Sequence, residues 1–115
     1  MEKYIPVVVI KKLEETCTIL KALKASGIYS AEITFRTEYA EEAIKLAVKE
    51  FPEMKTGAGT VINGEQCKRA IAAGAKFIVS PGLSRDVAEQ CKKNDIPYYP
   101  GCVTPTEIMG ALNLG

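Results

Sequence analysis

Histidine and tryptophan are both absent from this sequence of 115 residues. Without histidine, the chain has no Ser-His-Asp triad, no Cys/His dyad and no mixed Cys/His zinc site. Cysteine is scarce, with four widely spaced copies and no C-x-x-C pair. These are Cys17, Cys67, Cys91 and Cys102. We therefore expect no metal site, and we interpret the cysteines as reduced thiols of a cytoplasmic protein, most of them on apolar helix faces.

Neither sign of charge is in excess. The 15 Lys and Arg residues nearly balance the 14 Asp and Glu residues, which leaves a net charge of +1 and no strongly charged tail. This balance argues against nucleic acid or a membrane surface as the main partner. No apolar run approaches the length of a transmembrane helix, and no signal-peptide core precedes the first expected strand. We expect a single domain over residues 1–115.

What the sequence has instead is a regular alternation of strand-like and helix-like segments. Runs rich in β-branched and aromatic residues predict strands over residues 5–10, 31–37, 77–80 and 97–100, and a short run that is unusually rich in glycine is expected to form a further strand over residues 55–60. The first run is almost continuously apolar, which is typical of a strand buried on both faces. Apolar residues at helical spacing after each of the first four strands predict four helices.

Two helix starts carry strong local signals. Asn63 with Gln66 three positions later resembles a capping box, and Ile62 with Cys67 would form its hydrophobic staple. The Thr-Pro-Thr-Glu run at residues 104–107 combines a Thr cap, a Pro at the first helical position and a Glu three residues after the cap. It predicts the start of a fifth helix.

Five strand–helix units, with strand starts roughly 20 to 26 residues apart, predict an α/β fold with a parallel sheet and right-handed crossovers. Two architectures fit this pattern. One is a flavodoxin-like, doubly wound five-stranded sheet, for which this length is nearly ideal. The other is the first five units of a (β/α)8 TIM barrel, which normally needs about 200 residues or more. The number of units alone favours the doubly wound sheet.

The segment over residues 31–37 places an acid and a base on one face of a strand. Side chains at i, i+2 and i+4 of a strand share a face, so Glu32, Thr34 and Arg36 are expected to point the same way. A buried lone charge costs free energy unless it has a partner or a ligand. The two charges are therefore either an internal ion pair that braces the fold or part of a binding site.

In both architectures, the chemistry lies where strands end and helices begin. The first strand ends in two lysines, where a phosphate- or flavin-binding domain would have paired acids or a phosphate-binding loop. Gly57 and Gly59 lack the third glycine of a dinucleotide fingerprint. With Thr60 and Pro81 they are candidate ligand-binding residues. The alternative is structural: the glycines relieve crowding in a barrel, Thr60 faces solvent and Pro81 belongs to a turn.

Five motifs resemble a known family, in order and at matching intervals. They are IPVVVIKKLE (5–14), AEITFRT (31–37), GAGTV (57–61), SPGL (80–83) and PGxxTxxE (100–107). The family is 2-keto-3-deoxy-6-phosphogluconate (KDPG) aldolase, with its 4-hydroxy-2-oxoglutarate (KHG) aldolase activity, and the resemblance covers essentially the whole chain. It implies a (β/α)8 barrel, of which this chain forms about five units, and so overrides the preference drawn from the number of units.

The resemblance also implies a function. The expected activity is that of a class I aldolase, which cleaves a small 2-keto acid through a Schiff base and needs no cofactor. The catalytic residue implied is Glu32, as the general acid/base. The substrate-binding residues implied are Arg36, Thr60, Pro81, Gly57 and Gly59. Among these, Arg36 would bind the carboxylate of pyruvate as a two-pronged donor.

The Schiff-base amine is the part that the resemblance does not find in this chain. In the family it belongs to a lysine on the sixth strand, which we expect beyond Gly115 together with the phosphate-binding loops. Lys11 and Lys12 lie near the carboxyl end of a strand, but the resemblance gives neither of them this role. Lys55 and Lys76 come at the beginning of strands, at the opposite end from the chemistry.

The resemblance further implies a homo-oligomer, a trimer in the family. Two other classes of function stay open on the residues alone. One is a catalytically inert half-barrel fragment or assembly module, whose unpaired sheet edges would need a cover. The other is a complete five-unit phosphate- or flavin-binding domain, which the lysines after the first strand disfavour.

Overall fold

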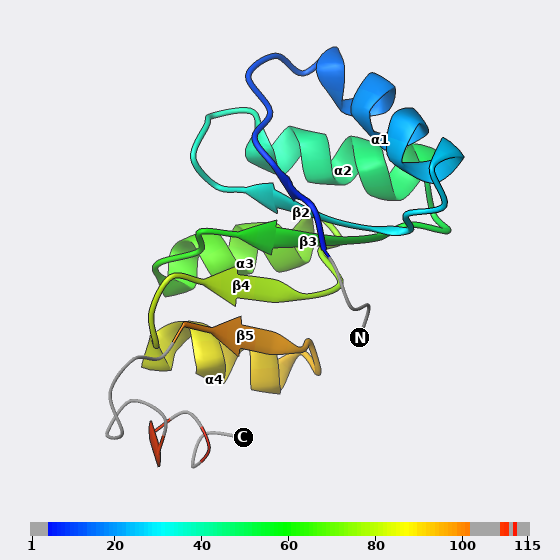
Figure 1. The fold of residues 1–115 in the computed structure, drawn as a ribbon. Coiled ribbons are helices and arrows are strands. Elements are labelled where there is room, and N and C mark those ends of the chain that lie inside the picture. Colours follow the sequence, from blue (N-terminus) through cyan, green and yellow to red (C-terminus); the bar gives the residue numbers. More distant parts are fainter. Residues whose placement is uncertain (1–4, 102–108, 111, 113–115) are drawn as a thin grey trace.

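The computed structural model describes residues 5–101, 109–110 and 112. In this part of the chain, strands and helices alternate (Figure 1). The strands are β1 (Val7–Val8), β2 (Ser30–Thr34), β3 (Lys55–Gly59), β4 (Ile78–Ser80) and β5 (Tyr98–Pro100). The helices are α1 (Glu15–Ala25), α2 (Ala40–Glu50), α3 (Gly64–Ala72) and α4 (Arg85–Lys93). The start of the expected fifth helix, at residues 104–107, lies outside the described residues.

The strands form one parallel sheet in the sequential order β1-β2-β3-β4-β5. The flavodoxin-like order 2-1-3-4-5 is therefore excluded, and the partial barrel is confirmed. Right-handed crossovers between sequential parallel neighbours place every helix on the same side of the sheet. Accordingly, α1 packs on α2, α2 on α3 and α3 on α4, as a single helix layer (Figure 1).

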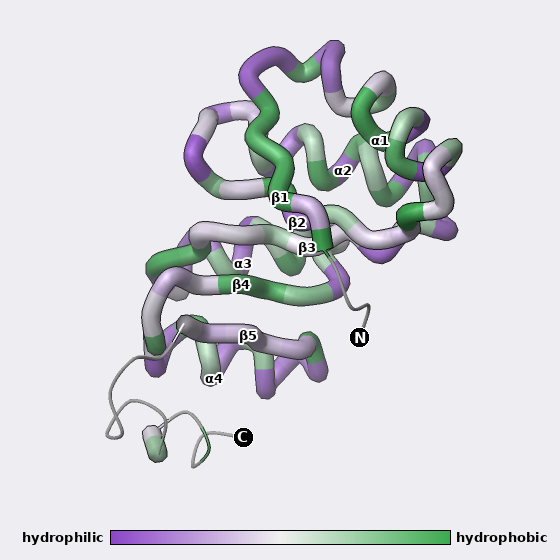
Figure 2. The backbone as a smooth tube through the Cα atoms, in the orientation of Figure 1, coloured by the Kyte–Doolittle hydropathy of each residue, from purple (hydrophilic) through white to green (hydrophobic). Residues whose placement is uncertain are grey.

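The apolar core lies between the sheet and this helix layer. On β2 every second residue, Ala31 and then Ile33, faces the helices and is fully buried. Ala58 of β3 and Ile78 of β4 continue this buried row across the sheet. The helices meet it with their own buried residues, which are Leu20, Ala43, Ile44, Ala47, Cys67, Ala70, Val87 and Cys91. The strands differ in hydropathy: Figure 2 shows β1 and β4 as strongly hydrophobic and β2 and β3 as paler.

The first two strands are shorter than the sequence predicts. Regular pairing in β1 is confined to Val7–Val8, and Val7 is 59% exposed. The expected burial on both faces is wrong, because Val7 is on an edge strand and on the sheet face opposite the helices. Strand β2 ends at Thr34, and the residues after it form a turn. Arg36 is thus on a turn rather than in the strand.

The start of α3 follows the predicted cap but departs from the prediction in two ways. The backbone N–H of Gln66 donates to Asn63 Oδ1 at 2.8 Å, as a capping box requires. In return, Gln66 Oε1 accepts from the N–H of Ile62 at 3.0 Å, one residue earlier than in the usual motif. The hydrophobic staple does not form, because Ile62 is 58% exposed whereas Cys67 is buried against α4.

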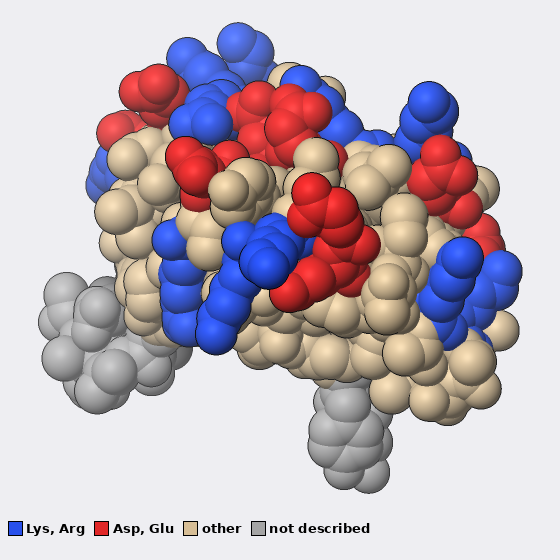
Figure 3. Space-filling model, turned by 90° about the horizontal axis from the view of Figure 1, so that it is seen from above, with Lys and Arg blue, Asp and Glu red and all other residues tan. Residues whose placement is uncertain are grey.

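Positive and negative side chains are interspersed over the face of the molecule drawn in Figure 3. Some of them pair across elements, as Arg69 of α3 does with Glu41 of α2 at 2.5 Å. Lys24 pairs with Glu53 at 2.5 Å in the same way. Such exposed pairs contribute little to stability. Among the described residues, no helix is long and apolar enough to cross a membrane.

Candidate active site

The sheet face opposite the helix layer has a different composition from the core. We call it the open face, and strand alternation assigns to it Val7, Ser30, Glu32, Thr34, Lys55, Gly57, Gly59, Phe77, Val79 and Tyr99. In the register of the sheet, Glu32 is opposite Gly57, and Thr34 is opposite Gly59. The acid singled out from the sequence therefore lies beside the glycine-rich strand.

Gly57 and Gly59 are small because other side chains occupy the space above them. A Cβ atom added to Gly59 would overlap the carboxylate of Glu32. A Cβ added to Gly57 would overlap the ring of Phe77. Glu32 thus reaches along the open face toward the carboxyl end of β3, and Phe77 forms a wall beside it. The ring of Phe77 also contacts Tyr99 of β5, with ring centroids 6.2 Å apart.

The Glu32 carboxylate is only partly accessible to solvent. Burial raises its pKa above the usual value, and the positive charge of Arg36 opposes this shift without cancelling it. The two charges are close enough to interact, yet no ion pair within 4 Å joins them, as far as the described residues go. The arrangement is therefore not a closed internal ion pair. Glu32 is an acid whose pKa is shifted toward neutrality, with a cation nearby.

A threonine holds the turn that carries Arg36. The hydroxyl of Thr37 donates to the carbonyl oxygen of Ile10 at 2.7 Å, and it accepts from the N–H of Tyr39 at 3.3 Å. This bond ties the turn after β2 to the end of β1. Thr37 is the last residue of the sequence motif at positions 31–37, and the motif alone does not indicate a role for it. A threonine directly after a candidate Arg is too common a pattern to identify such a tie.

Thr60 follows β3 in a strained backbone conformation. Its φ angle is +56°, which is rare for a β-branched residue. Such strain persists only where the surroundings impose it, and it is concentrated at functional sites. The next residue, Val61, is fixed on both sides, since its N–H donates to the carbonyl of Val79 at 3.2 Å and its own carbonyl accepts from Ser80 Oγ at 2.5 Å. Thr60 is thereby held at the carboxyl end of β3.

Pro81 comes directly after β4 and is exposed at the same end of the sheet. The N–H of Gly101 donates to the carbonyl of Ser80 at 3.0 Å, which ties the end of β5 to that of β4. Ser80 itself is buried and committed to Val61, so its role is structural. Pro81 is two strands away from Glu32 in the sheet, whereas Gly57 and Gly59 are in the adjacent strand.

The family model for KDPG and KHG aldolases matches residues 1–115. The chain belongs to the KDPG/KHG aldolase family. It is 42% identical over 111 residues to the KHG/KDPG aldolase of Escherichia coli K12, an alignment that covers 96% of this chain and 52% of that protein. The chain thus spans about half the length of the curated relatives that it matches.

Solved structures of KDPG aldolases have the same fold over this half. One from Legionella pneumophila, with pyruvate captured as a covalent carbinolamine intermediate, is 42% identical, with a TM-score of 0.92 and coverage of 96% of this chain and 54% of that one. One from Zymomonas mobilis with 3-phosphoglycerate is 39% identical, with a TM-score of 0.89 and coverage of 96% and 53%. The expected family and the partial barrel are both confirmed.

Within this half of a KDPG/KHG aldolase barrel, the candidate residues occupy three consecutive strands. Glu32 and the turn of Arg36 belong to β2, Gly57 to Thr60 belong to β3 and its end, and Pro81 follows β4. All of them lie on the open face or at the carboxyl ends of the strands, where barrel enzymes hold their active sites. The structure adds two residues to the candidates chosen from the sequence: Thr37, which fixes the turn of Arg36, and Phe77, which lies above Gly57.

Proposed function

We propose that the protein to which this chain belongs is a class I aldolase that forms a Schiff base with its substrate. It cleaves KDPG to pyruvate and glyceraldehyde 3-phosphate, or KHG to pyruvate and glyoxylate, or both. The observation that carries the proposal is the half-buried carboxylate of Glu32 above Gly59, with its raised pKa and Arg36 nearby. Membership of the KDPG/KHG aldolase family supports the reaction class.

The chemistry needs a group that both gives and takes protons. An amine adds to the keto group of the substrate, the carbinolamine loses water, and the resulting iminium accepts the electron pair of the breaking carbon–carbon bond. Glu32 donates a proton to the departing hydroxyl of the carbinolamine and then removes the proton of the substrate C4 hydroxyl. A general acid/base works best when its pKa is close to the working pH, and the partial burial of Glu32 shifts its pKa in that direction.

The other candidate residues hold the pyruvate part of the substrate. Arg36 offers two parallel N–H donors to the substrate carboxylate. Thr60 adds a hydroxyl hydrogen bond to the carboxylate or the carbonyl, and the glycines of β3 leave room for the Glu32 carboxylate and the Phe77 ring beside the ligand. Pro81 forms an apolar wall beside the methyl group of pyruvate. The partner is thus a small 2-keto acid.

We assign the Schiff-base lysine to the part of the family that follows this half. The lysines of the described residues support this assignment. Lys76 donates to the carbonyls of Pro52 and Met54 at 3.1 and 3.2 Å, before β3 and β4 begin and therefore at the opposite end from Glu32. Lys11 and Lys12, which follow β1, are exposed. We also propose the trimer that the resemblance implies and the cytoplasmic location that the widely spaced cysteines suggest, with light scattering on the purified protein as the test of the first.

Trapping with borohydride tests the proposed function. Pyruvate and borohydride are added to the 115-residue chain and to the natural-length protein, and the intact masses are measured. A reduced imine leaves a stable secondary amine on the lysine that formed it. We expect an adduct on the natural-length protein and none on the 115-residue chain.

An adduct on Lys11 or Lys12 would show that we have misplaced the nucleophile. No adduct on either protein would instead favour the alternative, an inert half-barrel module. Assays with KDPG and KHG then rank the two substrates.

A further inference from the structure

Two cysteines lie together in the helix layer, away from the open face. Cys67 of α3 and Cys91 of α4 are 0% and 1% exposed. Their sulfur atoms are 3.8 Å apart, and both are free thiols. The Cys67 sulfur also lies 3.9 Å from the carbonyl oxygen of Val87. The two thiols are therefore in direct contact, with no other side chain between them.

We propose that Cys67 and Cys91 are an oxidative modification site, at which a hydroperoxide converts the two thiols to a disulfide that links α3 to α4. A disulfide bond is about 2.05 Å long, so the two sulfurs must close to roughly half their present separation. Rotation about the side-chain bonds and a small shift between the two helices supply this movement. The proposal is independent of the aldolase function.

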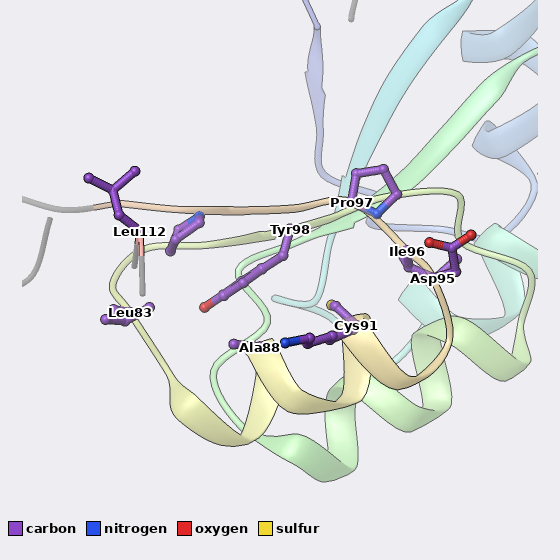
Figure 4. A pocket seen from close by; sticks show the side chains of 10 residues that line it. Leu83, Ala88, Cys91, Asp95, Ile96, Pro97, Tyr98 and Leu112 are labelled. Atoms are coloured by element: carbon purple, nitrogen blue, oxygen red, sulfur yellow. The ribbon is translucent and has the colours of Figure 1, made fainter. Parts of the chain in front are cut away.

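A route to the pair exists although its surface exposure is negligible. Cys91 lines a cavity of about 590 Å³ between α4 and β5, where it lies beside Ala88 and opposite Tyr98 (Figure 4). Ile96 and Pro97 form more of the lining. A small oxidant such as hydrogen peroxide fits a cavity of this size and reaches the dithiol from its Cys91 side.

The contact between the sulfurs also favours ionisation of one of them. An S–H donor facing the other sulfur lowers the pKa of Cys67, while the same contact raises the pKa of Cys91. The thiolate breaks the O–O bond of the hydroperoxide, becomes a sulfenic acid and releases an alcohol or water. The second thiol then attacks that sulfur, its S–O bond breaks, and water leaves. Two thiols and one hydroperoxide thus give one disulfide, one alcohol and one water.

The link would join two segments that lead out of the candidate active site. Helix α3 follows the strand end that carries Thr60, and α4 follows the strand end that carries Pro81. A disulfide between them closes a chain loop that runs from α3 through β4 to α4. Such a loop restricts the unfolded chain, so we expect oxidation to raise Tm by about 5–15 °C.

The test uses the natural-length protein, with Cys17→Ser as the matched control. Cys17 is a half-buried free thiol of α1, and among the residues that the structure describes it pairs with no other cysteine. The protein is treated with hydrogen peroxide, the remaining thiols are alkylated, and the peptides are analysed by mass spectrometry. We expect a peptide linked through Cys67 and Cys91, and a rise in Tm that dithiothreitol reverses. Cys17→Ser should behave like the parent.

Two variants test whether the Cys67–Cys91 pair causes the rise in Tm on oxidation. In Cys67→Ala and Cys91→Ala, the linked peptide and the difference in Tm between oxidised and reduced protein should both disappear. That difference is read within each variant, so a lower starting Tm does not obscure it. The proposal is overturned if both cysteines of the parent stay available for alkylation, after unfolding, under conditions that fully oxidise Cys17. It is also overturned if the linked peptides join other cysteines instead.

Discussion

The two faces of the sheet come from the same strands but are built for opposite purposes. Toward the helices, Ala31, Ile33 and Ala58 are fully buried and pack into one apolar core. Toward the open face, the same two strands present a carboxylate, two glycines and the hydroxyls of Ser30 and Thr34. Both hydroxyls are buried and lack a hydrogen-bond partner in the structure, and so do the hydroxyls of Thr16 and Thr56 on the helix side.

The difference shows where this fold is stabilised and where it accepts a cost. Apolar burial on the helix side contributes about 25 cal/mol per Å². On the open face, by contrast, the raised pKa of Glu32 means that folding disfavours its charge. A site that accepts such a cost has a function for that group. If the comparison is sound, substitutions on one face should change activity and those on the other should change stability.

The largest effect should come from Glu32→Gln in the natural-length protein. The amide keeps the shape of the carboxylate but cannot move protons, so kcat for cleavage should fall by about 10²–10⁴-fold. Borohydride trapping of pyruvate should stay detectable. Release of pyruvate from KDPG in a coupled assay measures the rate. Glu53→Gln is the control, since Glu53 is exposed and pairs with Lys24. An equal loss in both variants, or none in Glu32→Gln, would break the comparison.

At Ile33, the residue after Glu32 in β2, a substitution should lower stability rather than activity. Ile33→Ala removes a fully buried side chain from the helix side, so the free energy of unfolding should fall by about 2–5 kcal/mol. The turnover of the molecules that stay folded should remain close to that of the parent. Urea unfolding and active-site titration measure the two quantities. A stable Ile33→Ala protein with little activity would contradict the assignment of this residue to the core.

The glycines sharpen the comparison because each meets a different neighbour. In Gly59→Ala the new methyl group displaces the Glu32 carboxylate, and in Gly57→Ala it displaces the Phe77 ring. Both should lose about 1–3 kcal/mol of unfolding free energy, as overpacked sites do. The two variants should therefore be about equally stable, but only Gly59→Ala should also lose most of its activity. Gly82→Ala is the control, since a Cβ there meets nothing within 4 Å.

Much of the fold could be predicted from local patterns. Strand alternation, the Asn63 cap of α3 and the termination of α1 before Gly27, whose φ is +79°, all depend on residues that are neighbours in the sequence. The choice between a doubly wound sheet and a barrel could not be made in this way. Strand order depends on contacts between distant units, and only the resemblance to a family supplied that information.

The features of the candidate site likewise divide into those predictable from local sequence and those that depend on distant contacts. Placing Glu32 on the open face needed only the period of a strand, which is local. The role of Thr37 depends on a carbonyl 27 residues earlier, and the overlap that a Cβ atom on Gly57 would make with the Phe77 ring depends on how two strands are paired. The exposure of Val7 was missed because an apolar run does not reveal whether both faces of a strand are covered. The contact of Cys67 with Cys91 likewise requires the packing of α3 on α4.

The smallest expected effect is the pH dependence of stability caused by Glu32. Its pKa is raised in the folded chain, mainly by burial, so the folded chain binds its proton more tightly than the unfolded chain does. The free energy of unfolding therefore falls as pH rises from the unfolded pKa through the folded pKa. Glu32→Gln removes this loss. Relative to the parent, the variant should gain stability between acidic and neutral pH, measured by urea unfolding at a series of pH values.

Glu53 supplies a control of opposite sign. Its pKa is lowered, first by the hydrogen bond from Lys24, so its contribution is present above the unfolded pKa and is lost as pH falls through the folded pKa. Glu53→Gln should therefore become less stable than the parent as pH rises from the folded pKa of Glu53 to its unfolded pKa, a window that lies just below the one in which Glu32→Gln gains. Two curves of the same sign would mean that general charge repulsion, rather than the burial of Glu32 on the open face, sets the slope. Opposite slopes would locate the cost of the carboxylate on that face.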